Sequence, residues 1–233
     1  MGVLGSLLAL GLLLGLRHAL EADHVSTVAT LASRSASARQ TVGVAAAWGF
    51  GHAAALVLLG TALIGLGASL PERVSRLLEL AVGAILVVLG VGVLRRLRER
   101  RIHVHVHEHG GARHLHAHAH APAKDDDASA HDHAHGTVPW TRSLLIGGVH
   151  GLAGTAAITV LALPATRSAA QALLYLLVFG GGSILGMVGL SLVVSLPLRA
   201  AAQHLGRVAL GLEALLGVVD VGLGAWIVFM VFR

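Results

Sequence analysis

The sequence predicts an all-α integral membrane protein with six transmembrane helices, arranged as an inverted repeat of three plus three. Three observations lead to this fold class: an apolar composition, six apolar runs long enough to cross a bilayer, and a similarity between the two halves. Apolar residues make up 55% of the 233 positions and charged residues only 12%. Such a chain cannot bury its apolar surface in one soluble core, so lipid must cover part of it.

Each expected span is a run of about 20 apolar residues, the length that crosses the hydrocarbon core. The spans cover 8–32, 43–69, 74–94, 143–164, 169–197 and 208–231. They divide the chain into a first three-helix repeat (1–94), a His-rich loop (95–142) and a second three-helix repeat (143–233). All five prolines fall in connections or near span ends. The N-terminal apolar run has no basic segment before it, so we expect it to stay in the first span rather than be cleaved as a signal peptide.

Basic residues lie mainly in the connections after the first, third and fifth spans, and few lie on the opposite side. By the positive-inside rule, this predicts a multi-pass protein of the cell (inner) membrane with a cytoplasmic His-rich loop and two external termini. The arginines therefore act as orientation signals, and we expect no nucleic-acid partner. The residues of the basic side are Arg34, Arg39, Arg95, Arg96, Arg98, Arg100, Arg101, Arg113, Lys124, Arg142, Arg199 and Arg207, against Arg73, Arg76, Arg167 and Arg233.

The two halves align over two segments without gaps. Residues 15–31 align with 147–163, which pairs His18 with His150, and 73–90 align with 207–224, which pairs Glu79 with Glu213. The middle spans share only Phe50-Gly51 and Phe179-Gly180. A unit of three spans repeated once must be inverted, because three is odd, and inverted repeats are typical of transporters with a site near the midplane.

The segment Arg17-His18-Ala19-Leu20-Glu21-Ala22-Asp23-His24 carries five ionisable side chains inside an apolar span. Each charge at mid-membrane costs about 2.5–3.5 kcal/mol, so the segment needs compensation. Arg17 and Glu21, four positions apart, can form a helix salt bridge, which is the structural alternative. Imidazoles with carboxylates instead suit Ni, Co or Zn, and the chain has no cysteine for softer ions. On a straight helix these side chains point in different directions, so we expect a break or local unwinding here.

This segment resembles the first-span signature of the nickel/cobalt transporter family, R-H-A-x-D-A-D-H, with Glu21 in place of an aspartate. Trp48-Gly49-Phe50-Gly51-His52 resembles the family's second signature, a Gly-His preceded by aromatic residues. The stretch 147–158 is similar to the shorter, urease-accessory-type members, and it has His150 where longer members carry an acidic motif.

The resemblance implies transport of Ni²⁺ or Co²⁺, in the import direction, by a protein that is not an enzyme and needs no cofactor. It implies partners as well: membrane lipid, the metal ion and a cytoplasmic nickel chaperone or nickel-enzyme maturation factor. Efflux of the same ions is the alternative. The implied metal ligands are His18, Glu21, Asp23, His24 and His52, and the repeat adds His150.

Four further groups have more than one interpretation. His52 can instead be a buried histidine bonded to a backbone carbonyl. Glu79 and Glu213 lie near span ends, where snorkelling or helix–helix bonding explains them. Asp220 lies deeper, which makes it a candidate proton or metal relay.

Residues 103–136 hold eleven of the 16 histidines, followed in part by a run of aspartates. They have too little apolar surface to fold, so we expect a disordered cytoplasmic loop. Alternating histidines on a flexible chain provide several weak sites, which favours metal buffering over a plain spacer. These residues are His103, His105, His107, His109, His114, His116, His118, His120, His131, His133 and His135.

Other classes explain less of the sequence. His18-x4-Asp23 also fits the H-x4-D pattern of membrane acyltransferases, but that interpretation leaves His24, His52, the repeat and the His-rich loop without a role. A membrane metalloprotease lacks its H-E-x-x-H motif here. A zinc permease of another family accounts for the loop but not for the first-span motif.

Overall fold

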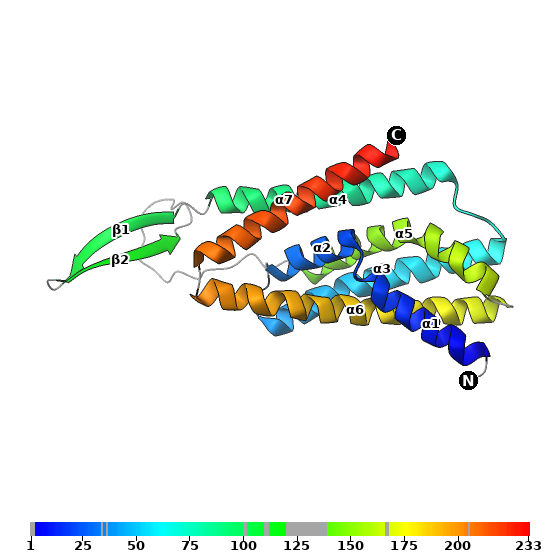
Figure 1. The fold of residues 1–233 in the computed structure, drawn as a ribbon. Coiled ribbons are helices and arrows are strands. Elements are labelled where there is room, and N and C mark those ends of the chain that lie inside the picture. Colours follow the sequence, from blue (N-terminus) through cyan, green and yellow to red (C-terminus); the bar gives the residue numbers. More distant parts are fainter. Residues whose placement is uncertain are drawn as a thin grey trace.

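A computed structural model of the chain describes residues 3–33, 35, 37–99, 102–109, 112–119, 139–165, 168–204 and 206–233. Long helices dominate it, and they lie side by side along one direction (Figure 1). The elements are α1 (Val3–His18), α2 (Ala22–Ser33), α3 (Ala38–Leu66), α4 (Glu72–Glu99), β1 (Ile102–His109), β2 (Ala112–Ala119), α5 (Trp140–Ala165), α6 (Ala169–His204) and α7 (Gly206–Val231).

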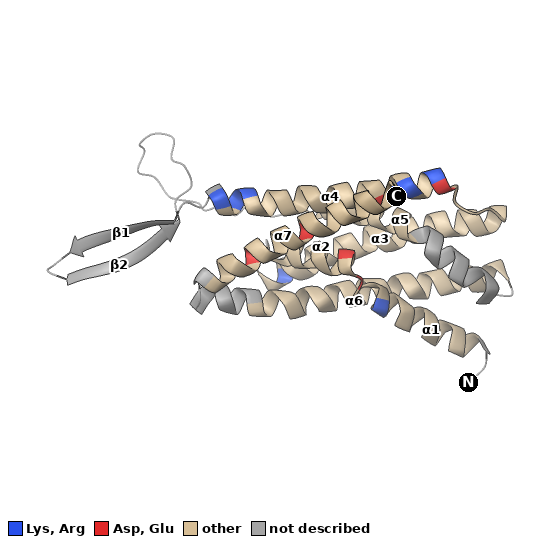
Figure 2. Cartoon of the chain, turned by 45° about the horizontal axis from the view of Figure 1, so that its top comes forward, with Lys and Arg blue, Asp and Glu red and all other residues tan. Residues whose placement is uncertain are grey.

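Four helices, α3, α4, α6 and α7, are each long and apolar enough to cross a membrane, and the bent pair α1 and α2 qualifies as one further span. Helix α5 has 26 residues, about 39 Å of helical rise, but its side chains are described only as far as Gly154. Charged residues gather at the two ends of α4 and leave its middle apolar (Figure 2), as a helix in a bilayer requires. The chain is therefore a multi-pass helical membrane protein.

The first span is broken, as its sequence predicted. Helix α1 ends at His18 and α2 begins at Ala22, with an angle of 61° between them. Two tight turns fill the gap: the Leu20 amide donates to the Arg17 carbonyl at 2.9 Å, and the Glu21 amide donates to the His18 carbonyl at 3.0 Å. Asp23 then lies in the first turn of α2, where a carboxylate is stabilised by the helix dipole.

Helix α6 is longer than expected. We expected its span to end at Pro197, but the helix continues to His204 with the proline inside it. Proline removes one backbone donor and usually kinks or ends a helix. Transmembrane helices tolerate such a residue because neighbouring groups satisfy the freed backbone atoms.

Close backbone contacts at glycines hold the helices together. A Cβ atom built at Gly51 of α3 would lie 2.1 Å from the Leu144 carbonyl oxygen of α5, so only glycine allows this approach. Gly182 of α6 approaches Leu12 of α1 in the same way, and Gly83 and Gly90 of α4 approach Gly224 and Gly217 of α7. Small residues at such points let helix backbones pack closely in lipid. In Figure 1, α4 runs antiparallel to α7, and α3 runs antiparallel to α6.

The His-rich segment departs from its expected disorder over part of its length. Strands β1 and β2 form an antiparallel hairpin whose register pairs His103 with His118 and His107 with His114. The expectation of disorder rested on the lack of apolar surface and overlooked two local signals. Alternation of period two suits a strand, and the Gly-Gly pair at 110–111 is typical of a two-residue hairpin turn. His120, His131, His133 and His135 lie outside the described residues.

Candidate metal centre

The break in the first span brings two histidines together. His18 is the last residue of α1 and His24 lies in the first turn of α2, and their ring centroids are 4.5 Å apart. His52 of α3 completes the group, with ring centroids 5.2 Å from His18 and 5.0 Å from His24. All three side chains are buried. A continuous helix would have pointed His18 and His24 to different sides.

One ring nitrogen from each of His18, His24 and His52 lies within 4.8 Å of the others. The Nε2 atoms of His18 and His52 are 3.2 Å apart. Two nitrogens bound at 2.0–2.1 Å to one ion are separated by at most about 4.2 Å. The three rings therefore need only small movements to bind a single transition-metal ion.

Two carboxylates orient these rings. The Nδ1 atom of His18 is 3.0 Å from Oε1 of Glu21, and the Nδ1 atom of His24 is 3.0 Å from Oδ1 of Asp23. Because an ionised carboxylate only accepts hydrogen bonds, each Nδ1 carries the proton and donates it. The lone pairs of His18 and His24 are then on Nε2, which is the arrangement of carboxylate–histidine pairs in metal sites. Glu21 pairs with His18, so the alternative Arg17–Glu21 salt bridge is not among the ion pairs of the described residues.

His150 of α5 lies beside this group. Its ring centroid is 5.6 Å from that of His24, and its Nδ1 donates to the Ile146 carbonyl oxygen at 3.3 Å. Within the described part of the chain, Nε2 of His150, Nε2 of His24 and Nδ1 of His52 are buried without a hydrogen-bond partner. Buried polar atoms are rarely left unpaired. These unpaired ring nitrogens therefore remain available to bind a metal ion, from His24 and His52 within the donor group and from His150 beside it.

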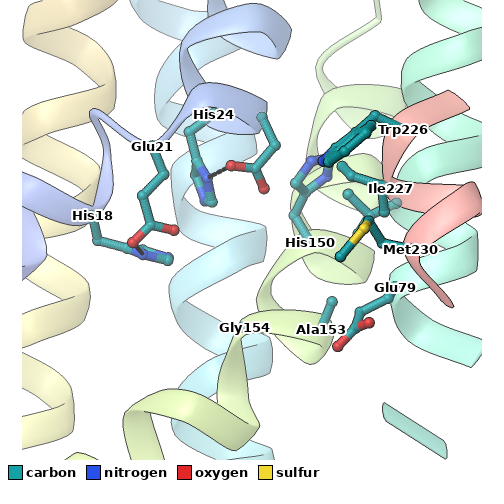
Figure 3. Close-up of a pocket in the computed structure, with 12 residues that line it drawn as sticks. His18, Glu21, His24, Glu79, His150, Ala153, Gly154, Trp226, Ile227 and Met230 are labelled. Carbon is teal, nitrogen blue, oxygen red and sulfur yellow. Dashed lines mark hydrogen bonds and ion pairs between the residues drawn. The ribbon is translucent and has the colours of Figure 1, made fainter. Parts of the chain in front are cut away.

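A cavity of about 310 Å³ adjoins the histidines (Figure 3). His18, Glu21 and His24 lie on one side of it, and His150, Glu79 and Met230 on the other. Asp23 also lines it, as does Trp226 of α7. The Glu21, Asp23 and His24 donors form a second group with ligand atoms within 4.8 Å. The cavity therefore offers both imidazole and carboxylate groups to a cation.

Several side chains around the site could not be identified from the sequence as neighbours of the histidines. Trp48 of α3 is fully buried, and its ring centroid lies 5.4 Å from His24 and 5.6 Å from His150. From the sequence, Trp48 was recognised only as an aromatic residue that precedes the Gly-His pair of the second signature. Glu79 lines the cavity but lies outside both donor groups found among the described residues, and Trp226 and Met230 carried no motif at all. Only their positions in the folded chain could have identified them.

Asp220 is separate from the histidine group. It is buried within α7 and accepts hydrogen bonds from the hydroxyls of Ser26 and Thr30 of α2. Glu213 lies two turns earlier on α7 and is partly buried. Neither carboxylate belongs to the candidate ligand groups of the described residues.

Comparison with known proteins adds the family. The urease accessory protein UreH of Bacillus sp. (strain TB-90) is 33% identical to this chain over 200 residues, which cover 86% of the chain and 81% of that protein. The chain belongs to the nickel/cobalt transporter family. It is thus a membrane transporter rather than an enzyme, which removes the acyltransferase and protease alternatives. No protein-family model and no solved structure matches the chain.

Proposed function

We propose that the chain imports Ni²⁺, or Co²⁺, through a site built on His18, His24 and His52. The observation that carries this proposal is the meeting of three buried histidines at the break of the first span. Imidazole nitrogens suit these borderline divalent ions, and the chain has no cysteine to favour softer ones. The name of the UreH relative, a urease accessory protein, also fits nickel, because urease is a nickel enzyme.

In this proposal Glu21 and Asp23 have two roles. They hold the His18 and His24 rings with Nε2 toward the ion, and their two negative charges balance an ion of charge +2. His150 supplies a further nitrogen from α5 when the ion moves toward the cavity. The ligand set predicted from the sequence is kept, with the carboxylates serving first to orient the rings.

We also propose that six spans form an inverted repeat. The glycine contacts support it, since they come in related pairs. Gly51 lies against Leu144, and Gly182 lies against Leu12. Leu12 and Leu144 are separated by the same number of positions as the aligned pair His18 and His150, so the two contacts are equivalent in the repeat. In the same way, Gly83 meets Gly224 while Gly90 meets Gly217. Such repeats permit alternating access to a site between the halves.

This repeat changes the pairing of the middle helices. The contact of Gly15 with Phe179 corresponds to that of Gly147 with Trp48, so Phe179 corresponds to Trp48 rather than to Phe50. His52 then corresponds to Ser183, which is also buried. Among the proposed ligands, only His18 and His150 correspond to each other as metal-binding residues of the two halves. The site is therefore asymmetric, with most of its ligands in the first repeat.

The remaining parts follow from the sequence. The basic residues favour a cytoplasmic His-rich segment and external termini in the inner membrane. There the histidines of 103–136 would buffer ions for a cytoplasmic nickel chaperone or maturation factor. Efflux is the second candidate, because the motif alone does not set direction.

Radiolabelled nickel accumulation in cells tests the proposal. The variants His18→Ala, His24→Ala and Asp23→Ala should each abolish transport at normal membrane abundance, because each removes either a ligand or the carboxylate that orients one. Deleting 103–136 should change apparent affinity by only a modest factor, and His114→Ala, a matched loss of one imidazole, should have no effect. Lower cellular nickel on expression of the natural chain would instead indicate efflux. Full loss on deleting the segment, with His18→Ala active, would refute the site.

A further inference from the structure

A buried carboxylate joins the last helix to the second half of the broken span. Asp220 lies near the middle of α7 and is fully buried. Its two oxygens accept hydrogen bonds from Ser26 and Thr30, both on α2. Ionisable groups at this depth are costly and usually mark proton relays or ion pathways.

No cation pairs with Asp220 among the described residues. On α4, Gly90 lies against Asp220, and the residues four positions to either side, Leu86 and Leu94, are apolar. Tyr175 is the one titratable residue of α6 between 169 and 197, and the nearest charged group on α7 is Glu213, two turns away. On α2 the titratable groups are Asp23 and His24. An unpaired carboxylate in such surroundings is stabilised by binding a proton.

Asp220 is connected to the metal centre through one helix face. Asp23, Ser26 and Thr30 are spaced by three and four positions, so they lie on the same side of α2. Three residues, about 4.5 Å of helical rise, separate Asp23 from Ser26. The α7 residue Trp226 lines the cavity together with Asp23. The α2–α7 contact thus runs from the cavity to Asp220.

The polar contact is not needed to build this helix interface. In the proposed repeat, the positions that correspond to Asp220, Ser26 and Thr30 are Leu86, Ile158 and Ala162, all apolar. The equivalent positions of α4 and α5 are therefore all apolar, whereas α7 and α2 carry a carboxylate and two hydroxyls. A residue kept only for packing would have no need of a charge.

We propose that Asp220 is the proton-binding site that couples proton movement to metal transport, an inference that rests on the proposed function. A divalent ion bound beside Asp23 disfavours a proton on Asp220 by adding positive charge on the same side of α2, so metal and proton bind alternately. Asp220 releases its proton to the external side when metal binds there, and takes one up from the cytoplasm after metal leaves. One Ni²⁺ entering for one H⁺ leaving moves one net positive charge inward, which the membrane potential favours.

Purified protein in liposomes with a trapped pH dye tests this inference. Nickel entry should make the lumen of wild-type vesicles more alkaline. Asp220→Asn keeps the size and an acceptor oxygen but cannot bind a proton, so the nickel-driven pH change should fall at least about tenfold. Exchange of labelled for unlabelled nickel needs no proton and should stay within about twofold of wild type. The control Glu72→Gln removes an exposed carboxylate at the start of α4 and should leave both readouts unchanged.

Three results would overturn the inference. Proton movement at the wild-type ratio in Asp220→Asn would remove its coupling role. Loss of nickel exchange in that variant would make Asp220 part of the binding site or the fold. Nickel uptake by the wild-type protein without any pH change would exclude proton coupling while leaving the proposed function intact. Absence of nickel uptake by wild-type protein, by contrast, would refute the proposed function itself.

Discussion

Replacing Gly51 with alanine should damage transport without touching a metal ligand. Gly51 lies on α3 directly before His52, and a Cβ atom there would lie 2.1 Å from the Leu144 carbonyl oxygen of α5. Carbon and oxygen atoms that are not bonded approach to about 3.3 Å at closest. The contact joins a Cβ atom, which is fixed to the α3 backbone, to a backbone carbonyl oxygen of α5, so neither atom can rotate away. The two helices must therefore separate locally by roughly 1.2 Å.

The separation has two consequences. Overpacking of this kind costs about 1–3 kcal/mol of stability. It also moves His52 of α3 away from His150 of α5, and a misplacement of about 1 Å in a precisely built site can cost on the order of 10²-fold in rate. We therefore expect nickel flux to fall by roughly 10²-fold, while the protein still reaches the membrane.

Nickel flux in proteoliposomes, together with thermal unfolding in detergent, measures both effects. The matched control is Gly65→Ala on the same helix, where an added Cβ meets no atom within 4 Å. It should preserve flux, and a helical Gly→Ala change should raise stability slightly. Near-normal flux in Gly51→Ala, or equal damage in Gly65→Ala, would refute the link between this helix contact and the site.

The other predictions concern the repeat, pH, orientation and the one departure in the motif. Gly182→Ala on α6, which brings a Cβ to 2.5 Å from Leu12, should impair flux like Gly51→Ala, whereas Gly181→Ala, with open space around it, should not. Acidifying the metal-loading side below about pH 6 should weaken nickel flux, because an imidazole, with its unperturbed pKa of about 6.5, binds metal only when it is neutral. Stimulation of flux by acid in the absence of a proton gradient would contradict the histidine ligands. A reporter placed in 103–136 should be cytoplasmic and one at Arg233 external, and labelling of the loop by an impermeant reagent from outside would reverse the orientation. Glu21→Asp restores the residue of the family signature and should remain active, and competition between nickel and cobalt flux measures its effect on metal preference.

The first-span motif could be understood from the sequence because its information is local. Five ionisable side chains in an apolar run are too costly in lipid without a function. The angular separation of His18 and Asp23 on a regular helix also required a break, and the break lies between them. Apolar run lengths likewise predicted the helices, although they could not detect that α6 continues past Pro197.

The partners of these residues were decided by the tertiary structure. His52 was predicted as a ligand only through the family resemblance. In the structure, close packing of α3 against the neighbouring helices brings its Nε2 atom to 3.2 Å from Nε2 of His18. The sequence allowed Glu21 to pair with Arg17, yet the bend turns Glu21 toward His18 instead. It could not connect Asp220 with Ser26 and Thr30, which are far away in the chain. Hydrophobic periodicity and the cost of burying a charge are properties of a single segment, so the sequence reveals them. Which segments touch depends on where glycine lets two helix backbones approach closely. Those contacts are determined only when all the helices pack together.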